Sequence, residues 1–392
     1  MILTNKQQEG LNIAVARYKA KERWTCIAGY AGSGKTTLVR FIINALQVNP
    51  EEDVAYIAFT GKAAQVLRQK GCPNAMTAHK LLYYSKPTPS GRFIYTPRPA
   101  IPYKIVVVDE VSMLSKELWE LLLSHKVYII ACGDPGQLPP VGKDACTDIL
   151  DHPHIFLDEI MRQAQESEII RLSMDIREGR PIEYTKGNEI QVIPGSEIVG
   201  GMYLWADQII TATNNSRFQI NTLMREAANR GPQPEIGDKI ICNRNCWDIS
   251  DTSETNALVN GTIGYITNIN AINYIYPHRS LTMPVPLFQT SFKTEYGDEF
   301  IDVPIDQLTI LDNKKFLTPQ QEYLFFKSPQ LKMEPMPIEF NYGYAITCHR
   351  SQGSQWDKVL VLEEKFPFDR EEHKRWLYTA VTRAAEKLVL VR

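Results

Sequence analysis

The sequence has no apolar run of about 18 residues or more, so a membrane-spanning helix is not expected. Its first residues, MILTNKQQEG, lack the basic stretch and apolar core of a secretory signal. A charge excess is also missing, because 43 basic and 45 acidic residues give a formal net charge of −2. Any binding of nucleic acid must therefore come from a local groove and not from overall attraction.

Cysteine is sparse, with seven residues among 392. Only Cys242 and Cys246 lie close together, and neither a CxxC pair nor a nearby pair of histidines accompanies them, so a metal site built on cysteine is not expected. Several cysteines lie inside apolar, strand-like runs, which is typical of reduced thiols. With the missing signal and membrane segment, this predicts a cytoplasmic protein with no membrane partner.

Short, β-branched apolar runs recur along the chain, each followed by a helix-like or loop segment. Such runs alternating with helices indicate α/β domains whose parallel sheets are covered on both faces. The length fits about two domains. The runs are residues 24–29, 54–59, 104–110 and 127–134 in the first half, and 208–213, 358–363 and 387–392 in the second.

Two segments interrupt this rhythm. Residues 84–103 are rich in proline and carry a Ser90-Gly91 turn, which predicts a small β-hairpin inserted into the first domain. Residues 242–336 read as short antiparallel strands, which predicts a small β-barrel insertion. The predicted division is a first domain at 1–185, a second domain at 186–241 and 337–392, and the insertion at 242–336.

The stretch GYAGSGKTT, residues 29–37, fits the phosphate-binding pattern G-x-x-x-x-G-K-[ST] between an apolar strand and a helix. The glycines let backbone N–H groups surround phosphates, and the helix N-terminus adds a favourable dipole. Lys35 would reach the β- and γ-phosphates, and Thr36 would bind Mg²⁺. The alternative is a glycine-rich turn without this role. The predicted nucleotide contacts here are Gly32, Ser33, Gly34, Lys35, Thr36 and Thr37.

A second motif is an acidic pair: in KIVVVDEVSM an apolar strand ends in Asp109-Glu110. Asp109 at the strand end can hold Mg²⁺, and Glu110 can polarise the attacking water. Acidic pairs also occur as simple caps of strands, which is the alternative. Together with the phosphate-binding loop, the pair predicts ATP and Mg²⁺ as cofactors.

The segments VVVDEVSM, GDPGQLPPV (133–141) and LDEIMRQ (157–163) resemble successive motifs of superfamily 1 helicases, most of all the compact phage or bacterial RecD- and Dda-like branch with 5′-to-3′ polarity. This resemblance implies two RecA-like domains. It gives Gln137 the role of sensing the γ-phosphate and Arg162 a role in stabilising transferred charge. LYTAVTRAAEKLVLV (377–391) resembles the final motif, with Arg383 as a second arginine. Surface arginines are the alternative for both.

The resemblance extends to the N-terminal LTNKQQ, which is similar to the family's adenine-reading segment. It implies that Gln7 contacts the base. Gln8 is the adjacent alternative, and a glutamine that only begins a helix is another. Relatives often place a stacking residue directly before the motif arginine, whereas this chain has Met161, so adenine stacking is expected to differ.

AITCHRSQGSQW, residues 345–356, contains hydroxyls, an amide, a glycine and basic residues that suit backbone and phosphate contacts. It resembles the family motif that links a bound strand to the ATP cleft. In the first domain AFTGKAAQVL and TAHKLL resemble segments that hold the DNA backbone, where Phe59 replaces a proline and is expected either to be buried or to stack on a base. The implied nucleic-acid contacts are Thr60, Lys62, Thr77, His79, Asn214, Thr347, His349, Arg350, Ser351 and Gln352.

The two insertions also have counterparts in the family. The hairpin resembles the pin that splits the duplex, with Phe93 as the residue that stacks on the terminal base pair and Tyr95 as the second choice. The alternative is that these aromatics attach the hairpin to its domain. The β-rich insertion resembles the SH3-like domain that clamps the strand against the pin.

The resemblance implies an ATP-dependent DNA helicase that moves 5′ to 3′ on single-stranded DNA and unwinds duplexes in replication, recombination or repair. It implies single-stranded and forked DNA as partners, with single-strand-binding or replication proteins also possible. It further implies an active monomer in a bacterial or phage-infected cytoplasm. The alternatives are an RNA helicase, a translocase with little unwinding, a P-loop phosphotransferase, or a binding module without turnover.

Overall fold

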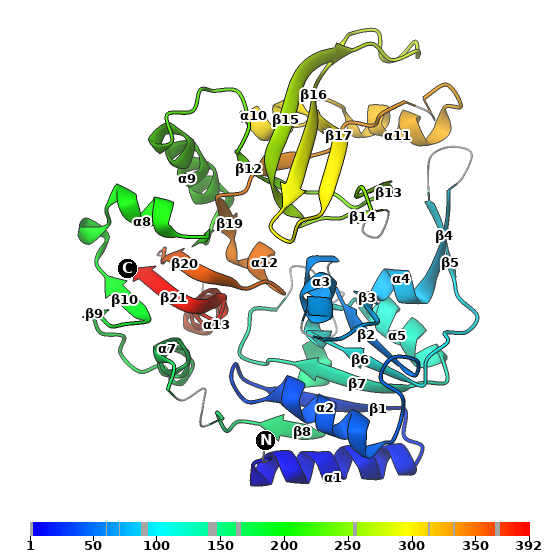
Figure 1. The fold of residues 1–392 in the computed structure, drawn as a ribbon, viewed down its shortest axis with the longest axis vertical. Coiled ribbons are helices and arrows are strands. Elements are labelled where there is room, and N and C mark those ends of the chain that lie inside the picture. Colours follow the sequence, from blue (N-terminus) through cyan, green and yellow to red (C-terminus); the bar gives the residue numbers. More distant parts are fainter. Residues whose placement is uncertain are drawn as a thin grey trace.

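The computed structural model describes residues 3–59, 61–69, 71–87, 93–139, 147–161, 166–253, 257–312, 314–331, 334–364 and 369–392. These residues form two parallel sheets, a third antiparallel sheet and two short antiparallel pairs. In Figure 1 the N-terminal sheet lies at the lower right, the C-terminal sheet at the left and the antiparallel sheet at the top. No helix in the described ranges combines the length and the apolar character needed to cross a bilayer.

The first sheet is parallel, with strand order β3-β2-β6-β7-β1-β8. Its central strands are buried along their whole length because helices cover both faces. The strands are β1 (Trp24–Gly29), β2 (Val54–Ala58), β3 (Ala75–Thr77), β6 (Ile105–Val108), β7 (Tyr128–Gly133) and β8 (Ile155–Leu157). The helices are α1 (Asn5–Lys19), α2 (Lys35–Ala45), α3 (Gly61–Gln69), α4 (Ala78–Leu82), α5 (Lys116–Ser124), η1 (Val111–Met113) and η2 (Thr147–Leu150).

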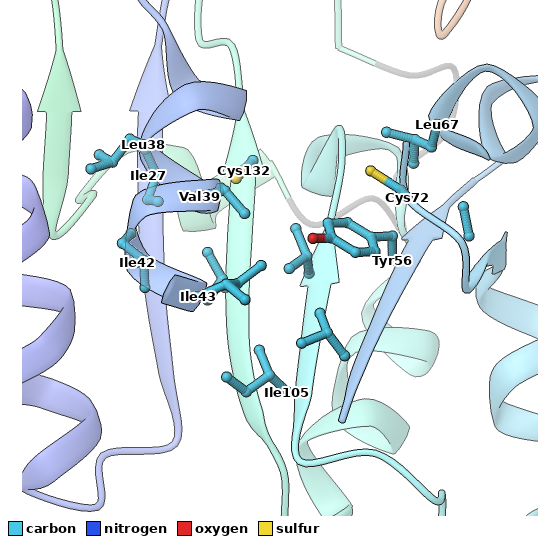
Figure 2. Packing of buried hydrophobic residues seen from close by; sticks show 14 of the residues in the cluster. Ile27, Leu38, Val39, Ile42, Ile43, Tyr56, Leu67, Cys72, Ile105 and Cys132 are labelled. Carbon is cyan, nitrogen blue, oxygen red and sulfur yellow. The ribbon is translucent and has the colours of Figure 1, made fainter. Parts of the chain in front are cut away.

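Packing of α2 on this sheet fixes the start of the helix at the end of β1. Leu38, Val39, Ile42 and Ile43 recur at helical spacing and point to one side, where they meet Ile27 of β1. Figure 2 shows these side chains together between helix and sheet. The buried face holds α2 in place, so the loop between β1 and α2 has a fixed position at the carboxyl edge of the sheet.

The second sheet has the order β19-β11-β20-β21-β10-β9, parallel except for the edge pair β9–β10. Its buried residues pack against α13 and α7. The strands are β9 (Thr185–Lys186), β10 (Ile190–Ile193), β11 (Gln208–Thr211), β19 (Ala345–Thr347), β20 (Trp356–Leu362) and β21 (Ala384–Val391). The helices are α7 (Glu168–Glu178), α8 (Gly200–Trp205), α9 (Asn214–Ala227), α12 (Cys348–Ser351), α13 (Arg370–Val381) and η3 (Gly195–Glu197).

The third sheet is antiparallel, with the order β17-β16-β15-β12-β18. A separate hairpin, β4–β5, extends from the first half, and β13–β14 forms a second small pair. The strands are β4 (Tyr83–Pro87), β5 (Phe93–Pro97), β12 (Lys239–Cys242), β13 (Cys246–Ser250), β14 (Ala257–Leu258), β15 (Ile263–Tyr274), β16 (Val285–Thr294), β17 (Glu299–Asp306) and β18 (Phe340–Tyr342). The helices are α10 (Gln307–Asp312) and α11 (Pro319–Lys327).

Three features differ from the predicted division of the chain. Helix α7 lies within the predicted first range, yet its buried residues Ile169, Leu172 and Ile176 join the core of the second sheet. Strand β12 crosses the predicted border at 241/242, and β18 follows the one at 336/337, yet both pair within the antiparallel sheet. Burial of apolar faces against distant partners decides these memberships, and that is not visible in local patterns.

Candidate functional site

The loop after β1 has the backbone of an anion-binding turn. Gly34 adopts φ 81° and ψ 28° directly before α2, and Gly32 has φ 75°. A Cβ at Gly34 would lie 2.4 Å from Gln7 Nε2 and 2.5 Å from Met161 Sδ, so these side-chain ends would have to move, and the positive φ favours glycine on conformational grounds. Helix α2 begins directly after Gly34, so its first N–H groups, which have no acceptor within the helix, lie at this loop.

The side chains of this loop fit a phosphate group. Lys35 Nζ donates to the carbonyl oxygens of Gly29 (2.6 Å) and Tyr30 (3.0 Å), so its ammonium is held inside the loop. Ser33 Oγ is buried without a hydrogen-bond partner among the described residues. Thr36 is exposed and Thr37 half-buried in the first turn of α2. A cation, an unpaired hydroxyl and the first N–H groups of α2 form a donor set that suits phosphate oxygens.

Gln7 is packed against the phosphate-binding loop and is only 1% exposed. Its Oε1 accepts from Thr4 N (3.1 Å), which completes a capping box at the start of α1. Its Nε2 donates to Ser33 O (3.3 Å). The side chain of Met161 also lies beside Gly34, and its backbone N–H donates to Gly32 O (3.0 Å). Both polar ends of Gln7 are thus engaged within the protein, and its adenine contact stays a prediction.

Asp109 and Glu110 follow β6, the strand next to β7 in the first sheet. Glu110 has a positive φ of 51°, an uncommon conformation for a residue with a side chain, which often marks a functional site. Burial raises the pKa of its carboxyl to about 7, Arg383 lowers it, and the neighbouring Asp109 and Asp134 raise it. A carboxylate with this pKa can accept a proton near neutral pH.

Two groups of the C-terminal half reach Glu110. Arg383 Nη1 lies 4.0 Å from Glu110 Oε1, and the backbone N–H of Gly353 donates to the same carboxylate. Arg383 is 4% exposed, and its guanidinium also donates to Thr379 O and Ser354 O. A cation from one parallel-sheet half therefore faces Glu110 of the other.

The loop after β7, residues 134–138, also contacts both halves. Gln137 is half-buried there, and its backbone N–H donates to Asp134 O (3.3 Å). Leu138 N donates to Thr379 Oγ1 of α13 (2.8 Å). Tyr378 precedes Thr379 in α13, and its hydroxyl lies between Asp134 Oδ2 and Ala31 N. The sequence alone does not point to Tyr378 or Asp134, because a tyrosine in an apolar helix is typical of a core residue.

Several of the predicted nucleic-acid contacts are used inside the protein. Ser351 is fully buried and donates to Cys348 O (2.7 Å), and Gln352 Nε2 donates to Leu138 O (2.7 Å). Thr347 is 8% exposed. Arg350 is exposed and donates to Asn243 Oδ1 (2.6 Å), while His349 is half-buried and burial lowers its pKa. Of the segment 345–352, His349 and Arg350 are the predicted contacts best placed to meet a ligand.

Thr77 and His79, two of the predicted contacts in the first half, lie near the β4–β5 hairpin. Thr77 Oγ1 accepts from Lys80 N and caps α4. His79 stacks on Tyr83 at 5.9 Å between ring centroids, and burial lowers its pKa. Tyr95 packs edge-on to both rings and is 38% exposed. Phe59 is 41% exposed, so the alternative in which it is buried is wrong.

The remaining predicted residues are placed as follows. Asn214 is exposed at the first position of α9. Thr60 and Arg162 lie outside the described residues. Lys62 falls in α3 and Phe93 begins β5, but the positions of their side chains are likewise outside the description.

Two family models match the chain. One, described as an AAA domain, covers residues 3–193, and the other, described as a UvrD-like helicase C-terminal domain, covers residues 342–391. The first contains the phosphate-binding loop and the Asp109-Glu110 pair, and the second contains Arg383. The two matches thus contain the groups that meet at Glu110.

Curated relatives point the same way. The chain is 28% identical to the ATP-dependent DNA helicase dda of Enterobacteria phage T4 over 209 residues, 50% of this chain and 46% of that protein. It is 25% identical to the ATP-dependent RecD2 DNA helicase of Deinococcus radiodurans over 414 residues, 97% of this chain and 49% of that protein. The chain thus spans about half the length of these relatives.

Solved structures share the fold. A Pif1 helicase from Bacteroides in complex with ADP-AlF3 and ssDNA matches with a TM-score of 0.54 and 19% identity, covering 100% of this chain and 92% of that chain. Pif1 helicase from Candida albicans matches with a TM-score of 0.51 and 18% identity, covering 100% and 94%. These likenesses agree with two RecA-like domains around parallel sheets. The chain is thus similar to an AAA domain at residues 3–193, to a UvrD-like helicase C-terminal domain at residues 342–391, and to curated ATP-dependent DNA helicases of the Dda and RecD2 kind.

Proposed function

We propose that the protein is an ATP-dependent DNA helicase that moves on single-stranded DNA and unwinds duplexes. The observation that carries this proposal is the approach of Arg383, from the C-terminal half, to within 4.0 Å of Glu110 in the N-terminal half. A nucleotide in the loop at Lys35 would be enclosed by groups from both halves. Binding and hydrolysis could then change how the halves meet, which is what a motor requires.

For hydrolysis, each residue has a separate task. Lys35 and the N–H groups of α2 would hold the β- and γ-phosphates, with Gln137 at the γ-phosphate. Thr36 and Asp109 would hold Mg²⁺, which supplies charge neutralisation for the phosphates when bound. Glu110 would accept a proton from the attacking water, and Arg383 would stabilise the charge that develops on the transferred group. Arg162 is proposed to assist from the hinge side.

For the DNA strand, we propose a path over the first half and along residues 345–352. Thr60, Lys62, Thr77 and His79 would contact it on one side, and Asn214, His349 and Arg350 on the other. Support comes from the exposed aromatic ring of Phe59 beside this path, because stacking on bases is tolerant of sequence. Thr347, Ser351 and Gln352 would act from beneath the surface, since they are buried.

The two additions to the motor are proposed to separate strands. The β4–β5 hairpin would be the pin, with Phe93 at its tip side and Tyr95 as the second candidate. The antiparallel sheet β17-β16-β15-β12-β18 would be an SH3-like clamp. Further parts of this proposal are 5′-to-3′ polarity, an active monomer, a cytoplasmic setting and single-strand-binding or replication partners. The proposed domain division is shifted so that α7 belongs to the second domain and β12 and β18 belong to the antiparallel insertion.

The deciding experiment compares ATP-driven unwinding of one DNA duplex carrying either a 5′ or a 3′ single-stranded tail. Unwinding from the 5′ tail only is expected. Unwinding from the 3′ tail only would indicate a helicase of the opposite polarity. Hydrolysis stimulated by RNA but not by DNA would indicate an RNA helicase. Lys35→Ala serves as the control that removes the phosphate cation, and undiminished hydrolysis in that variant would contradict the nucleotide site.

A further inference from the structure

The hydroxyl group of Tyr378 joins the two halves of the molecule directly. It accepts a hydrogen bond from Ala31 N in the phosphate-binding loop (2.8 Å) and donates one to Asp134 Oδ2 after β7 (2.7 Å). Tyr378 itself belongs to α13 in the C-terminal half and is 2% exposed. A buried hydroxyl with both of its bonds made to the opposite half is a specific, directional connection.

The surroundings of the Tyr378 ring hold this connection in place. A Cβ at Gly136 would lie 3.1 Å from Tyr378 Cε1 and 3.4 Å from Tyr30 Cδ1, so the glycine leaves room for the ring against the loop. Asp134 is fixed in turn, because its Oδ1 accepts from Gly136 N (2.9 Å). The acceptor, the ring and the glycine form one packed unit at the boundary between the halves.

The same turn of α13 carries the link to the catalytic arginine. Thr379 Oγ1 accepts from Leu138 N (2.8 Å), so two neighbouring side chains of α13 hold the 134–138 loop. Arg383 Nε donates to Thr379 O (3.1 Å) at the end of this helix. A shift of the last turn of α13 would therefore move the guanidinium relative to Glu110.

We propose that Tyr378 is a positioning residue for hydrolysis: its hydroxyl ties the last turn of α13 to the phosphate-binding loop and to Asp134, and thereby sets where Arg383 stands against the nucleotide. This inference rests on the proposed function. Tyr378 does not act on the reacting phosphate in this account. It works through Arg383, which contributes only when the two halves meet in one geometry.

Tyr378→Phe tests this inference because it removes only the hydroxyl. The expected result is a fall of about tenfold in the kcat of DNA-stimulated ATP hydrolysis, with KM for ATP changed less than about threefold. Tyr128→Phe is the matched control, since it removes the hydroxyl of another buried tyrosine, which donates to Ala14 O (3.1 Å) at the start of β7, the far end of that strand from the 134–138 loop. Its kcat is expected to equal that of the wild type.

A double-mutant cycle separates positioning from simple loss of structure. Arg383→Lys keeps a cation and measurable turnover but loses the guanidinium geometry. If Tyr378 acts through Arg383, adding Tyr378→Phe to Arg383→Lys lowers kcat by less than about twofold. A full, independent tenfold loss in the double variant, or an unchanged kcat in the single variant, would overturn the inference.

Two further measurements keep the outcomes distinct. Urea unfolding of Tyr378→Phe reports whether the variant is folded under assay conditions. If Tyr378→Phe is unfolded, Gly136→Ala is tested in its place, because the added methyl group would displace the Tyr378 ring. Gly136→Ala is expected to lower kcat with little change in KM, and a normal kcat in this variant would contradict the inference. Absence of ATP hydrolysis in the wild type would instead refute the proposed function.

Discussion

At the scale of single residues, Glu110 combines an unusual backbone with an unusual carboxyl group. Its φ is positive, and its carboxylate lies 4.0 Å from Arg383 Nη1 and accepts from the backbone N–H of Gly353. Burial raises its pKa to about 7, and the nearby Asp109 and Asp134 act in the same direction against Arg383. A general base must be ionised, so this environment makes activity depend on pH near neutrality.

We therefore predict that kcat/KM for ATP is nearly constant above about pH 7 and falls about tenfold per pH unit below it, since the protonated carboxyl cannot accept a proton. The measurement is steady-state hydrolysis from about pH 5.5 to about pH 8.5 with Mg²⁺ in excess. Glu110→Gln removes the ionising group, so its residual rate should lose this step. A wild-type profile without a step near pH 7 would argue against Glu110 as the base.

Gln7 leads to a prediction about stability. Its amide makes two hydrogen bonds, to Thr4 N and Ser33 O, while it is almost completely buried. Gln7→Ala should lower the free energy of unfolding by about 1–3 kcal/mol, because it leaves these groups unpaired. The exposed neighbour Gln8, whose Nε2 donates to Asn12 Oδ1 in the same helix, is the matched control, and Gln8→Ala should change the free energy of unfolding by less than about 0.5 kcal/mol.

Urea denaturation of both variants checks this prediction, and equal effects would contradict it. KM for ATP and GTP in the same proteins addresses the base contact that the sequence predicts. Loss of preference for ATP in Gln7→Ala would assign Gln7 to adenine, and loss in Gln8→Ala would assign the neighbour. An unchanged preference in both would leave Gln7 as a support of the loop.

These residues also show what the sequence can predict about the site. The loop at residues 29–37 and the Asp109-Glu110 pair can be predicted from the sequence, because their expected chemistry depends on neighbours in the chain. Gln352 illustrates the other case: its motif suggests a contact with DNA, whereas its amide donates to Leu138 O, more than two hundred residues away. The sequence does not reveal the role of Tyr378 for the same reason, since its partners Ala31 and Asp134 are in the other half.

At the scale of elements, the central strands were predictable and their partners were not. The apolar runs at 24–29, 54–59, 104–110 and 127–134 correspond to β1, β2, β6 and β7, because a strand buried on both faces needs continuous apolar residues. Very short strands such as β3 and β19 give no such signal. Nor does periodicity reveal that β12 and β18 pair with each other across about a hundred residues.

The hairpin β4–β5 leads to the prediction at this scale. If Phe93 stacks on the terminal base pair, Phe93→Ala should slow unwinding about tenfold, the effect of losing a stacking contact of about 1–3 kcal/mol. Hydrolysis stimulated by single strands should stay near the wild-type rate, because the motor is untouched. Both rates are measured on one forked substrate.

Tyr184→Ala is the control, because Tyr184 is an aromatic residue that is 62% exposed and lies directly before β9 in the other half. It should leave both rates unchanged. Unimpaired unwinding by Phe93→Ala would move the role to Tyr95, which is 38% exposed and packs against His79 and Tyr83 at the base of the hairpin. Tyr95→Ala would then be expected to slow unwinding, and normal unwinding by both variants would remove the pin role.

At the scale of the whole molecule, a net charge of −2 leaves only local contacts to attract the strand. Lys62 and Arg350 are the cations among the proposed DNA contacts, while burial lowers the pKa of His349 and His79 and favours their neutral forms. Each phosphate contact on a single strand contributes about −0.7 to the slope of log K against log salt concentration. Two such contacts predict a slope of about −1.4, shallow for a protein that binds DNA.

Arg350→Gln should therefore reduce this slope to about −0.7 and weaken binding by a similar factor for every sequence, because a phosphate contact carries no base information. Fluorescence anisotropy of a labelled oligonucleotide, titrated at several salt concentrations without nucleotide, measures the slope. Lys387→Gln is the control, since Lys387 bonds to Asn188 O at the edge near β10, and it should leave the slope unchanged. A steep wild-type slope, near that of a strongly basic groove, would mean that the strand follows a different path across the two halves.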